Sequence, residues 1–142
     1  MPSDAAAGRS VPVWRPVRGG NAFDTAYMYG DGAHEAQLGH WIYNRGVRKQ
    51  VIVIGKGGHT PFCDPKNIKS QLNQSLNRLR TDYVDLYMAH RDNLELPVSA
   101  FIDVFNELQQ AGLVRAFGVS NWSIERISAA NDYAKSKGLT EL

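Results

Sequence analysis

The chain has 142 residues, of which 43% are hydrophobic and 21% charged, and this is the composition of an ordinary soluble globular domain. Its net charge of +2 and the lack of a Lys/Arg cluster argue against a nucleic-acid partner, and no apolar run approaches the roughly 18 residues of a membrane helix. Cys63 is the only cysteine, so no internal disulfide can form. We therefore expect a cytoplasmic protein without membrane contact.

The first twenty residues, MPSDAAAGRSVPVWRPVRGG, predict an irregular lead-in to a single folded domain at 21–142. Three arginines against one acid give this segment the charge of a transit peptide, which is the weaker alternative. Pro12 and Pro16 would interrupt the amphipathic helix that such a peptide needs.

Beyond this lead-in, short apolar runs alternate with amphipathic segments of helical periodicity. The runs, which predict strands, cover 21–26, 51–55, 83–89 and 115–119. Strands that alternate with helices of this length indicate βα units and a parallel sheet. We therefore interpret the chain as four consecutive βα units.

The four helices are predicted from apolar residues at helical spacing and from residues typical of helix ends. The apolar faces are, in chain order, Leu38, Trp41 and Ile42; Ile68, Leu72, Leu76 and Leu79; Phe101, Val104, Phe105 and Leu108; and Ile124, Ile127 and Ala130. The end signals are Gly46 after the first helix; Asp64 and Pro65 at the start of the second; Pro97 before and Gly112 after the third; and Ser123 before and Gly138 after the fourth.

A polar residue closes each predicted strand: Asp24, Lys56, His90 and Asn121, at spacings of 32, 34 and 31 residues. In a parallel βα fold the carboxyl ends of all strands lie on one face, where active sites are built. The spacing therefore gathers an acid, a lysine, a histidine and an asparagine around one opening. The alternative is that polar residues simply terminate strands, but four in succession favour a site.

Tyr29 adds a proton donor in the loop five residues beyond Asp24. A tyrosine is a poor acid at neutral pH, but a nearby lysine ammonium favours the phenolate, and a carboxylate can hold that lysine charged and in place. Asp24, Lys56 and Tyr29 can form such a relay, and His90 could orient a carbonyl or share its proton. This set suits proton transfer to a carbonyl oxygen. Tyr27 is the rival tyrosine in the same loop.

Four segments, FDTAYMYG, VIVIGKGG, DYVDLYMAHRD and AFGVSNW, resemble motifs of the aldo-keto reductases in their order and approximate spacing. The resemblance spans about residues 20–140 and implies NADPH-dependent reduction of a small aldehyde or ketone. By position, the catalytic tetrad would be Asp24, Tyr29, Lys56 and His90, with Tyr29 as proton donor. Ser120 and Asn121 match the pair that binds the nicotinamide carboxamide.

The fold implied by this resemblance is an eight-stranded (β/α) barrel of about 250 residues, of which the chain predicts roughly half. The loops after strands 7 and 8 that bind phosphate would lie beyond residue 142, and no GxGxxG motif replaces them. We therefore expect an incomplete chain. Two hypotheses follow: part of a carbonyl reductase, or an inert truncation or non-enzymatic binding subunit. Open sheet edges would permit self-association.

The remaining histidines and the cysteine predict no metal site. His34, His40 and His59 lack the spacing and companions of a zinc site, and Cys63 is expected to be structural or incidental.

Three residues that follow strand ends, His59, Phe62 and Arg91, could touch the substrate, although loop filler is the default for each. Trp122 either lines the pocket or packs at the start of its helix.

Overall fold

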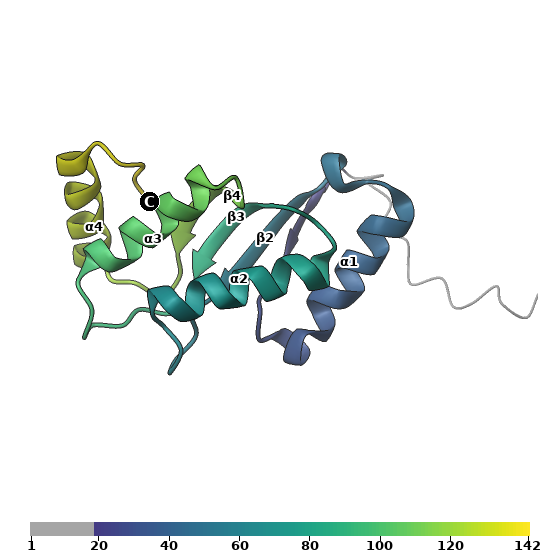
Figure 1. Cartoon of the computed structure of the whole chain (residues 1–142), viewed down its shortest axis with the longest axis horizontal. Helices are drawn as coiled ribbons and strands as arrows, with labels where there is room; N and C mark the ends of the chain where they lie inside the picture. The colour runs from purple at the N-terminus through teal and green to yellow at the C-terminus, as the bar shows by residue number, and fades with distance from the viewer. Residues whose placement is uncertain (1–18) are drawn as a thin grey trace, which may run out of the picture.

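The structure, a computed structural model, describes residues 19–142 as four strands that are each followed by a helix (Figure 1). The elements are β1 Ala22–Asp24, the 3-10 helix η2 Tyr29–Gly32, α1 Ala33–Arg45, the 3-10 helix η3 Arg48–Gln50, β2 Ile52–Gly57, α2 Pro65–Leu79, β3 Val84–Ala89, α3 Val98–Gln110, β4 Val114–Val119 and α4 Ile124–Lys137. The expected lead-in lies outside the described residues, apart from Gly19 and Gly20. Within residues 19–142, no helix is both long and apolar enough to cross a membrane.

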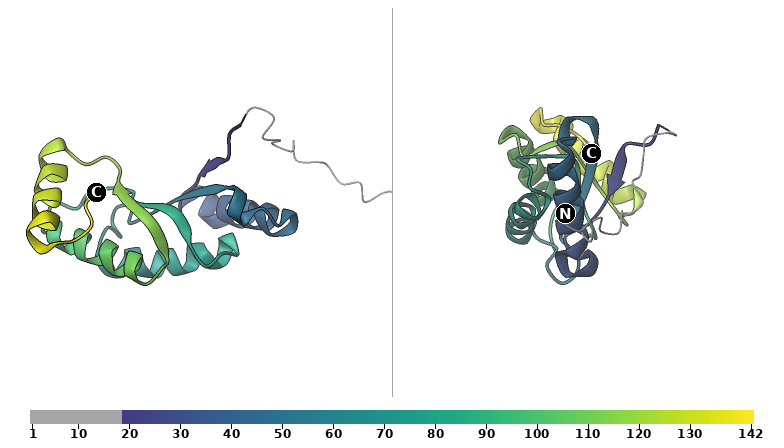
Figure 2. Two further views of the ribbon diagram at one scale, coloured as in Figure 1. Left: turned by 90° about the horizontal axis from the view of Figure 1, so that it is seen from above. Right: turned by 90° about the vertical axis from the view of Figure 1, so that its right-hand side faces the viewer.

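The four strands form one parallel sheet in the order β1-β2-β3-β4, as the alternating pattern predicts. Each predicted strand coincides with an observed one to within two residues at either end. The helices α1, α2 and α3 cover one face of this sheet, and α4 lies beyond β4 against α3 (Figures 1 and 2). The fold is therefore about half of a (β/α)8 barrel.

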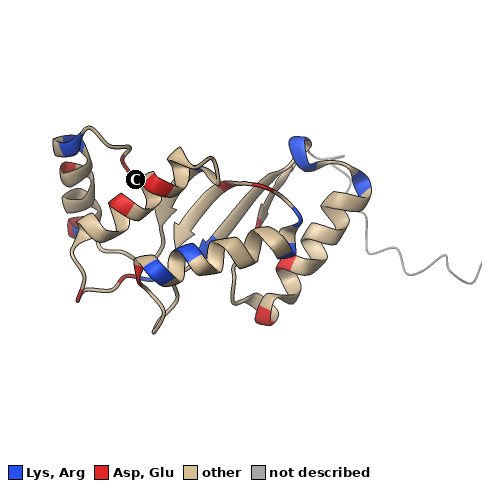
Figure 3. Ribbon diagram, in the orientation of Figure 1, with Lys and Arg blue, Asp and Glu red and all other residues tan. Residues whose placement is uncertain are grey.

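The core lies between the sheet and its helices, where the predicted apolar faces of α2 and α3 are all buried. Phe105 of α3 stacks on Phe117 of β4 with ring centroids 5.2 Å apart, and Tyr87 of β3 meets Phe105 edge-on. Basic residues of α2 lie beside acidic residues of α3 (Figure 3), and Lys69 donates to Glu107 at 2.5 Å. The helical spacing of apolar residues therefore predicted correctly which residues of α2 and α3 are buried in the core.

The predicted helix ends are confirmed by their local geometry. The Asp64 carboxylate accepts the backbone N–H of Asn67 at 2.9 Å with Pro65 in the first turn, and the Ser123 hydroxyl accepts the N–H of Arg126 at 3.2 Å. Gly46 and Gly138 have left-handed backbones with φ of 62° and 66°, the conformation that ends many helices.

Ile124 corrects the prediction for the fourth helix, because its side chain is 81% exposed instead of facing inward. The helix packs on α3 through Ala130 and Ala134, both fully buried. At about 100° per residue, Ile124 lies about 120° around the helix from Ala130. Arg126, in contrast, lies close to the inward-facing stripe formed by Ala130 and Ala134. Ile127 lies on the other side of that stripe and is half-buried.

The sheet face opposite the helices is only partly covered. Ile54 pairs with Leu86 and Lys56 with Met88 across the β2–β3 ladder, and alternate residues such as Val53 and Tyr87 point toward the helices. Ile52, on the open face, is 41% exposed. In a closed barrel this face would be the interior.

Candidate active site

The polar residues expected at the strand ends meet at one edge of the sheet. Asp24 is the last residue of β1, Lys56 is the penultimate residue of β2, His90 directly follows β3, and Asn121 lies two residues beyond β4. The parallel topology places all four at the carboxyl ends of the strands, so the sequence spacing is translated directly into proximity.

Lys56 is the buried centre of this group, with only 6% of its surface exposed. Its ammonium forms an ion pair with the carboxylate of Asp24 and donates to the backbone oxygen of Thr25 at 3.0 Å. A buried ammonium is expensive unless it is paired and hydrogen-bonded, and both conditions are met here. The Asp24 side chain remains 60% exposed, so the pair opens onto the surface.

Tyr29 lies against this ion pair, with the Lys56 ammonium 5.2 Å from the centre of its ring. The chain reaches this position because Gly30 and Asp31 take left-handed conformations, with φ of 56° and 51°, which fold the loop back after the tyrosine. The Tyr29 hydroxyl has no hydrogen-bond partner among residues 19–142, which leaves it available to an incoming group.

Tyr27, the rival tyrosine, is engaged with helix α2. Its hydroxyl donates to Gln74 Oε1 at 3.1 Å, and the guanidinium of Arg78 lies 4.5 Å from the centre of its ring. The Tyr27 hydroxyl is therefore occupied. The Tyr27 backbone N–H donates to the Lys56 backbone oxygen at 2.8 Å, but the ring beside the Lys56 ammonium is that of Tyr29.

His90 completes the cluster through ring contacts on two sides. Its ring meets Tyr29 edge-on at 5.7 Å and His59 edge-on at 5.0 Å between centroids. Burial lowers the pKa of His90 from its ordinary value, and the charges of His59, Lys56 and Arg91 act in the same direction against the opposing effect of Asp24. The lowered pKa favours the neutral imidazole of His90, which can donate one hydrogen bond.

Ser120 and Asn121 lie at the β4 end of the same edge. Asn121 has a left-handed backbone with φ of 64°, which asparagine tolerates better than most residues. Its Nδ2 donates to the backbone oxygen of His90 at 3.1 Å and to the Ser120 hydroxyl at 2.9 Å. Its Oδ1 has no partner among the described residues. An unpaired acceptor beside a hydroxyl suits a carboxamide, which offers both N–H and C=O groups.

A cavity of about 310 Å³ opens beside the cluster, and both Lys56 and His90 contribute to its wall. His59 and Phe62 also line this cavity, as does Tyr27, whereas Tyr29 does not. Arg91 does not line it, but donates from Nε to His59 Nε2 at 3.3 Å.

Trp122 takes the packing role of the two alternatives. Its ring meets Phe101 edge-on at 5.1 Å, and its indole N–H donates to the backbone oxygen of Arg91 at 3.3 Å. The tryptophan therefore joins α4 to α3 and to the loop after β3.

Glu35 is a buried polar residue that the sequence interpretation missed. Its side chain is fully buried in α1, where Oε2 accepts from Arg78 Nη1 at 3.2 Å. Burial raises the pKa of this carboxyl, and Ser75 and Arg78 only partly offset the effect. The signal was present, because Glu35 precedes Leu38 by three residues and Ile42 by seven, on the apolar stripe.

Sequence comparison places the chain among known oxidoreductases. The profile of the Aldo/keto reductase family matches residues 16–140. An aldo-keto reductase of Bacillus subtilis, YhdN, is 39% identical over 115 residues, which cover 73% of this chain and 34% of the relative. An aldo-keto reductase of Schizosaccharomyces pombe whose name specifies NADP(+) is 30% identical over 138 residues, covering 91% of this chain and 41% of the relative. The chain therefore spans between about a third and two fifths of the length of these relatives.

Solved structures agree with this assignment. An aldo-keto reductase from Klebsiella pneumoniae in complex with NADPH superimposes with a TM-score of 0.68 at 33% identity, covering 77% of this chain and 37% of that one. A glycerol dehydrogenase from Gluconobacter oxydans gives a TM-score of 0.71 at 27% identity, covering 79% and 37%. Both the fold and the sequence thus point to the same family.

Proposed function

Because the chain belongs to the aldo/keto reductase family, we propose that it carries the catalytic end of an NADPH-dependent reductase of small aldehydes or ketones. The NADPH bound to the similar Klebsiella enzyme supports the choice of cofactor. The observation that carries the proposal is the position of Lys56, which lies between the Asp24 carboxylate and the ring of Tyr29.

In this proposal Tyr29 donates its hydroxyl proton to the carbonyl oxygen of the substrate. The Lys56 ammonium stabilises the phenolate that remains, and Asp24 holds that ammonium charged and in position. His90, as a neutral imidazole, donates a hydrogen bond that orients the carbonyl. NADPH, when bound, supplies the hydride to the carbonyl carbon. One hydride and one proton convert the carbonyl to an alcohol.

The nicotinamide carboxamide would be held by Ser120 and Asn121. The unpaired Oδ1 of Asn121 can accept the carboxamide N–H, and the Ser120 hydroxyl can donate to its oxygen. Asn121 Nδ2 donates to the His90 backbone oxygen, so the pair that would hold the cofactor lies beside the residue that would orient the carbonyl.

A chimera tests the proposal, in which residues 16–140 replace the matching segment of the Bacillus subtilis relative. We expect it to oxidise NADPH in the presence of an aromatic aldehyde, and Lys56→Met to remove this activity. A folded chimera that binds NADPH without turnover would instead support the non-catalytic binding alternative. The exposed Lys135→Met variant serves as the matched control.

A further inference from the structure

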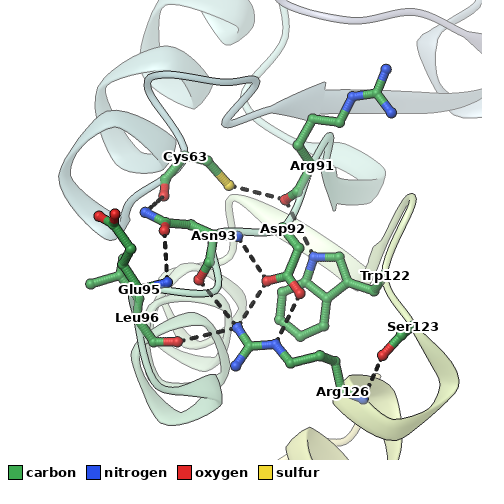
Figure 4. Close-up of polar contacts among 9 residues, drawn as sticks. All are labelled: Cys63, Arg91, Asp92, Asn93, Glu95, Leu96, Trp122, Ser123 and Arg126. Atoms are coloured by element: carbon green, nitrogen blue, oxygen red, sulfur yellow. Dashed lines mark hydrogen bonds and ion pairs between the residues drawn. The ribbon is translucent and has the colours of Figure 1, made fainter.

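Asp92 and Arg126 form an ion pair that the proposed reaction does not use (Figure 4). Arg126 donates from Nε to Asp92 Oδ2 at 2.9 Å and from Nη2 to Asp92 Oδ1 at 2.8 Å. The Arg126 side chain is 19% exposed and the Asp92 side chain 11%. A two-pronged pair of this kind fixes direction as well as distance, because the guanidinium and the carboxylate are both planar.

The same guanidinium holds more of the loop after β3. Arg126 Nη2 also donates to the backbone oxygens of Asn93 at 3.3 Å and Leu96 at 3.2 Å. Arg126 comes from the first turn of α4, which is fixed by the Ser123 cap. A single side chain therefore binds the start of α4 to several points of the loop that carries His90.

The loop after β2 joins this arrangement through Cys63. The Cys63 thiol donates to the backbone oxygen of Arg91 at 3.0 Å, and Asn93 Nδ2 donates to the backbone oxygen of Cys63 at 3.0 Å. The indole of Trp122 donates to the same Arg91 oxygen at 3.3 Å. Loops after three neighbouring strands thus meet around Arg91 and Asp92 (Figure 4).

We propose that Asp92 and Arg126 are positioning residues, whose ion pair locks the loops after β2, β3 and β4 together and so keeps His90 in register with Asn121. Asp92 lies two residues after His90, and Arg126 lies five residues after Asn121. The pair closes a ring whose other link is the hydrogen bond from Asn121 Nδ2 to the His90 backbone oxygen. The functional role of this placement of His90 relative to Asn121 rests on the proposed function. The locking of the loops by the Asp92–Arg126 ion pair does not.

Cys63 reports on the lock because it is the only cysteine of the chain and is 3% exposed. Burial raises the pKa of its thiol to about 11, and the negative charges of Asp92 and Asp64 add to this effect. Arg126→Gln leaves Asp92 without its positive partner, so electrostatics alone should make the thiol less reactive. Faster modification in this variant can therefore come only from opening of the loops.

The experiment compares the rate of Cys63 modification by iodoacetamide in the native 142-residue chain and in Arg126→Gln, with Lys135→Gln on the same helix as control. We expect a rate about 10-fold higher or more in Arg126→Gln and no change in Lys135→Gln, and an intermediate rate in Arg126→Lys, which keeps the charge but loses the fork. Hydrogen exchange should rise in residues 91–97 and stay low in residues 52–57, which separates local opening from loss of the fold.

An unchanged or slower rate in Arg126→Gln overturns the proposal, as does equal exchange increase in residues 52–57. If Arg126→Gln fails to fold, Arg126→Lys decides by the same two criteria. NADPH titration of the same substitutions in the chimera separates the two proposals. Faster modification in the 142-residue chain without NADPH binding by any chimera keeps the lock and removes the cofactor role, whereas weaker NADPH binding in the Arg126→Gln chimera than in the Lys135→Gln chimera supports both.

Discussion

Tyr29 and Tyr27 lie two residues apart, yet only the Tyr29 ring lies beside the Lys56 ammonium, whereas the Tyr27 hydroxyl is bonded to Gln74. We expect Tyr29→Phe to abolish carbonyl reduction by the chimera, because loss of a general acid costs about 10²- to 10⁴-fold, and to leave NADPH binding nearly unchanged. Tyr27→Phe is the matched control, and should retain turnover. Steady-state kinetics and NADPH fluorescence titration measure the two effects. Loss of turnover in Tyr27→Phe alone would show that the wrong tyrosine was chosen.

Asn121 offers a second prediction at the level of a single side chain. Asn121→Gly should weaken NADPH binding by about 1–3 kcal/mol, because the carboxamide loses its partner. Glycine is the informative substitution, since it tolerates the left-handed backbone at φ of 64° that alanine would strain. Fluorescence titration measures the change in the chimera. If Asn121→Gly binds like the unmodified protein while Asn121→Ala does not, backbone strain and not the side chain is responsible.

At the scale of whole elements, the periodicity of apolar residues predicted buried positions best where one face of a helix packs on the sheet. The Asp64–Pro65 start and the buried stripe of α2 could be predicted because capping and helical spacing are local properties. The inward face of α4 could not, because it depends on how α4 crosses α3. Ile124 is apolar but exposed, whereas the charged Arg126 is drawn inward by Asp92, from a different loop.

The site shows the same division between local and tertiary information. The positions of Asp24, Lys56 and His90 follow from strand ends, which a single sequence reveals through the βα repeat. The contact of His59 with His90 and the ion pair of Asp92 with Arg126 depend on how far neighbouring loops extend beyond the strand ends. No spacing rule along the chain encodes how far a loop extends.

The packing of α1 on α2 gives an element-scale prediction, because it buries Glu35 beside Arg78. Since burial raises the pKa of Glu35, its contribution to stability is present below the unfolded value near 4.5 and is lost as pH rises through the higher folded value. Relative to Glu35→Gln, the native chain should therefore lose unfolding free energy as pH rises from about 4.5 toward neutrality. Denaturant unfolding at several pH values measures this.

The exposed Glu95→Gln variant is the control for this pH series, and its difference from the native chain should stay nearly constant. If the native chain instead gains unfolding free energy relative to Glu35→Gln as pH rises, the attraction of Arg78 for the Glu35 carboxylate outweighs the cost of burying it. Glu35 would then be an ordinary stabilising ion pair.

At the scale of the whole molecule, the described sheet has two edges, because β1 and β4 are each paired on one side only within residues 19–142. The open face of the sheet also leaves Ile52 partly exposed. The barrels to which the chain is similar are longer, and this chain covers 37% of the Klebsiella and Gluconobacter structures. Unpaired strand edges and uncovered apolar side chains both favour association with further polypeptide.

We therefore predict that a polypeptide of these 142 residues self-associates through its open sheet and reduces carbonyls poorly by itself. Each large apolar side chain left half-exposed forfeits about half of the roughly 1.5–3 kcal/mol that its full burial would contribute, against a typical domain stability of about 5–15 kcal/mol. Sedimentation should show species larger than a monomer, and Ile52→Lys on the open face should shift them toward the monomer, whereas the exposed Gln37→Lys on α1 should not. A compact monomer that binds NADPH at micromolar concentration and reduces an aromatic aldehyde would contradict this prediction.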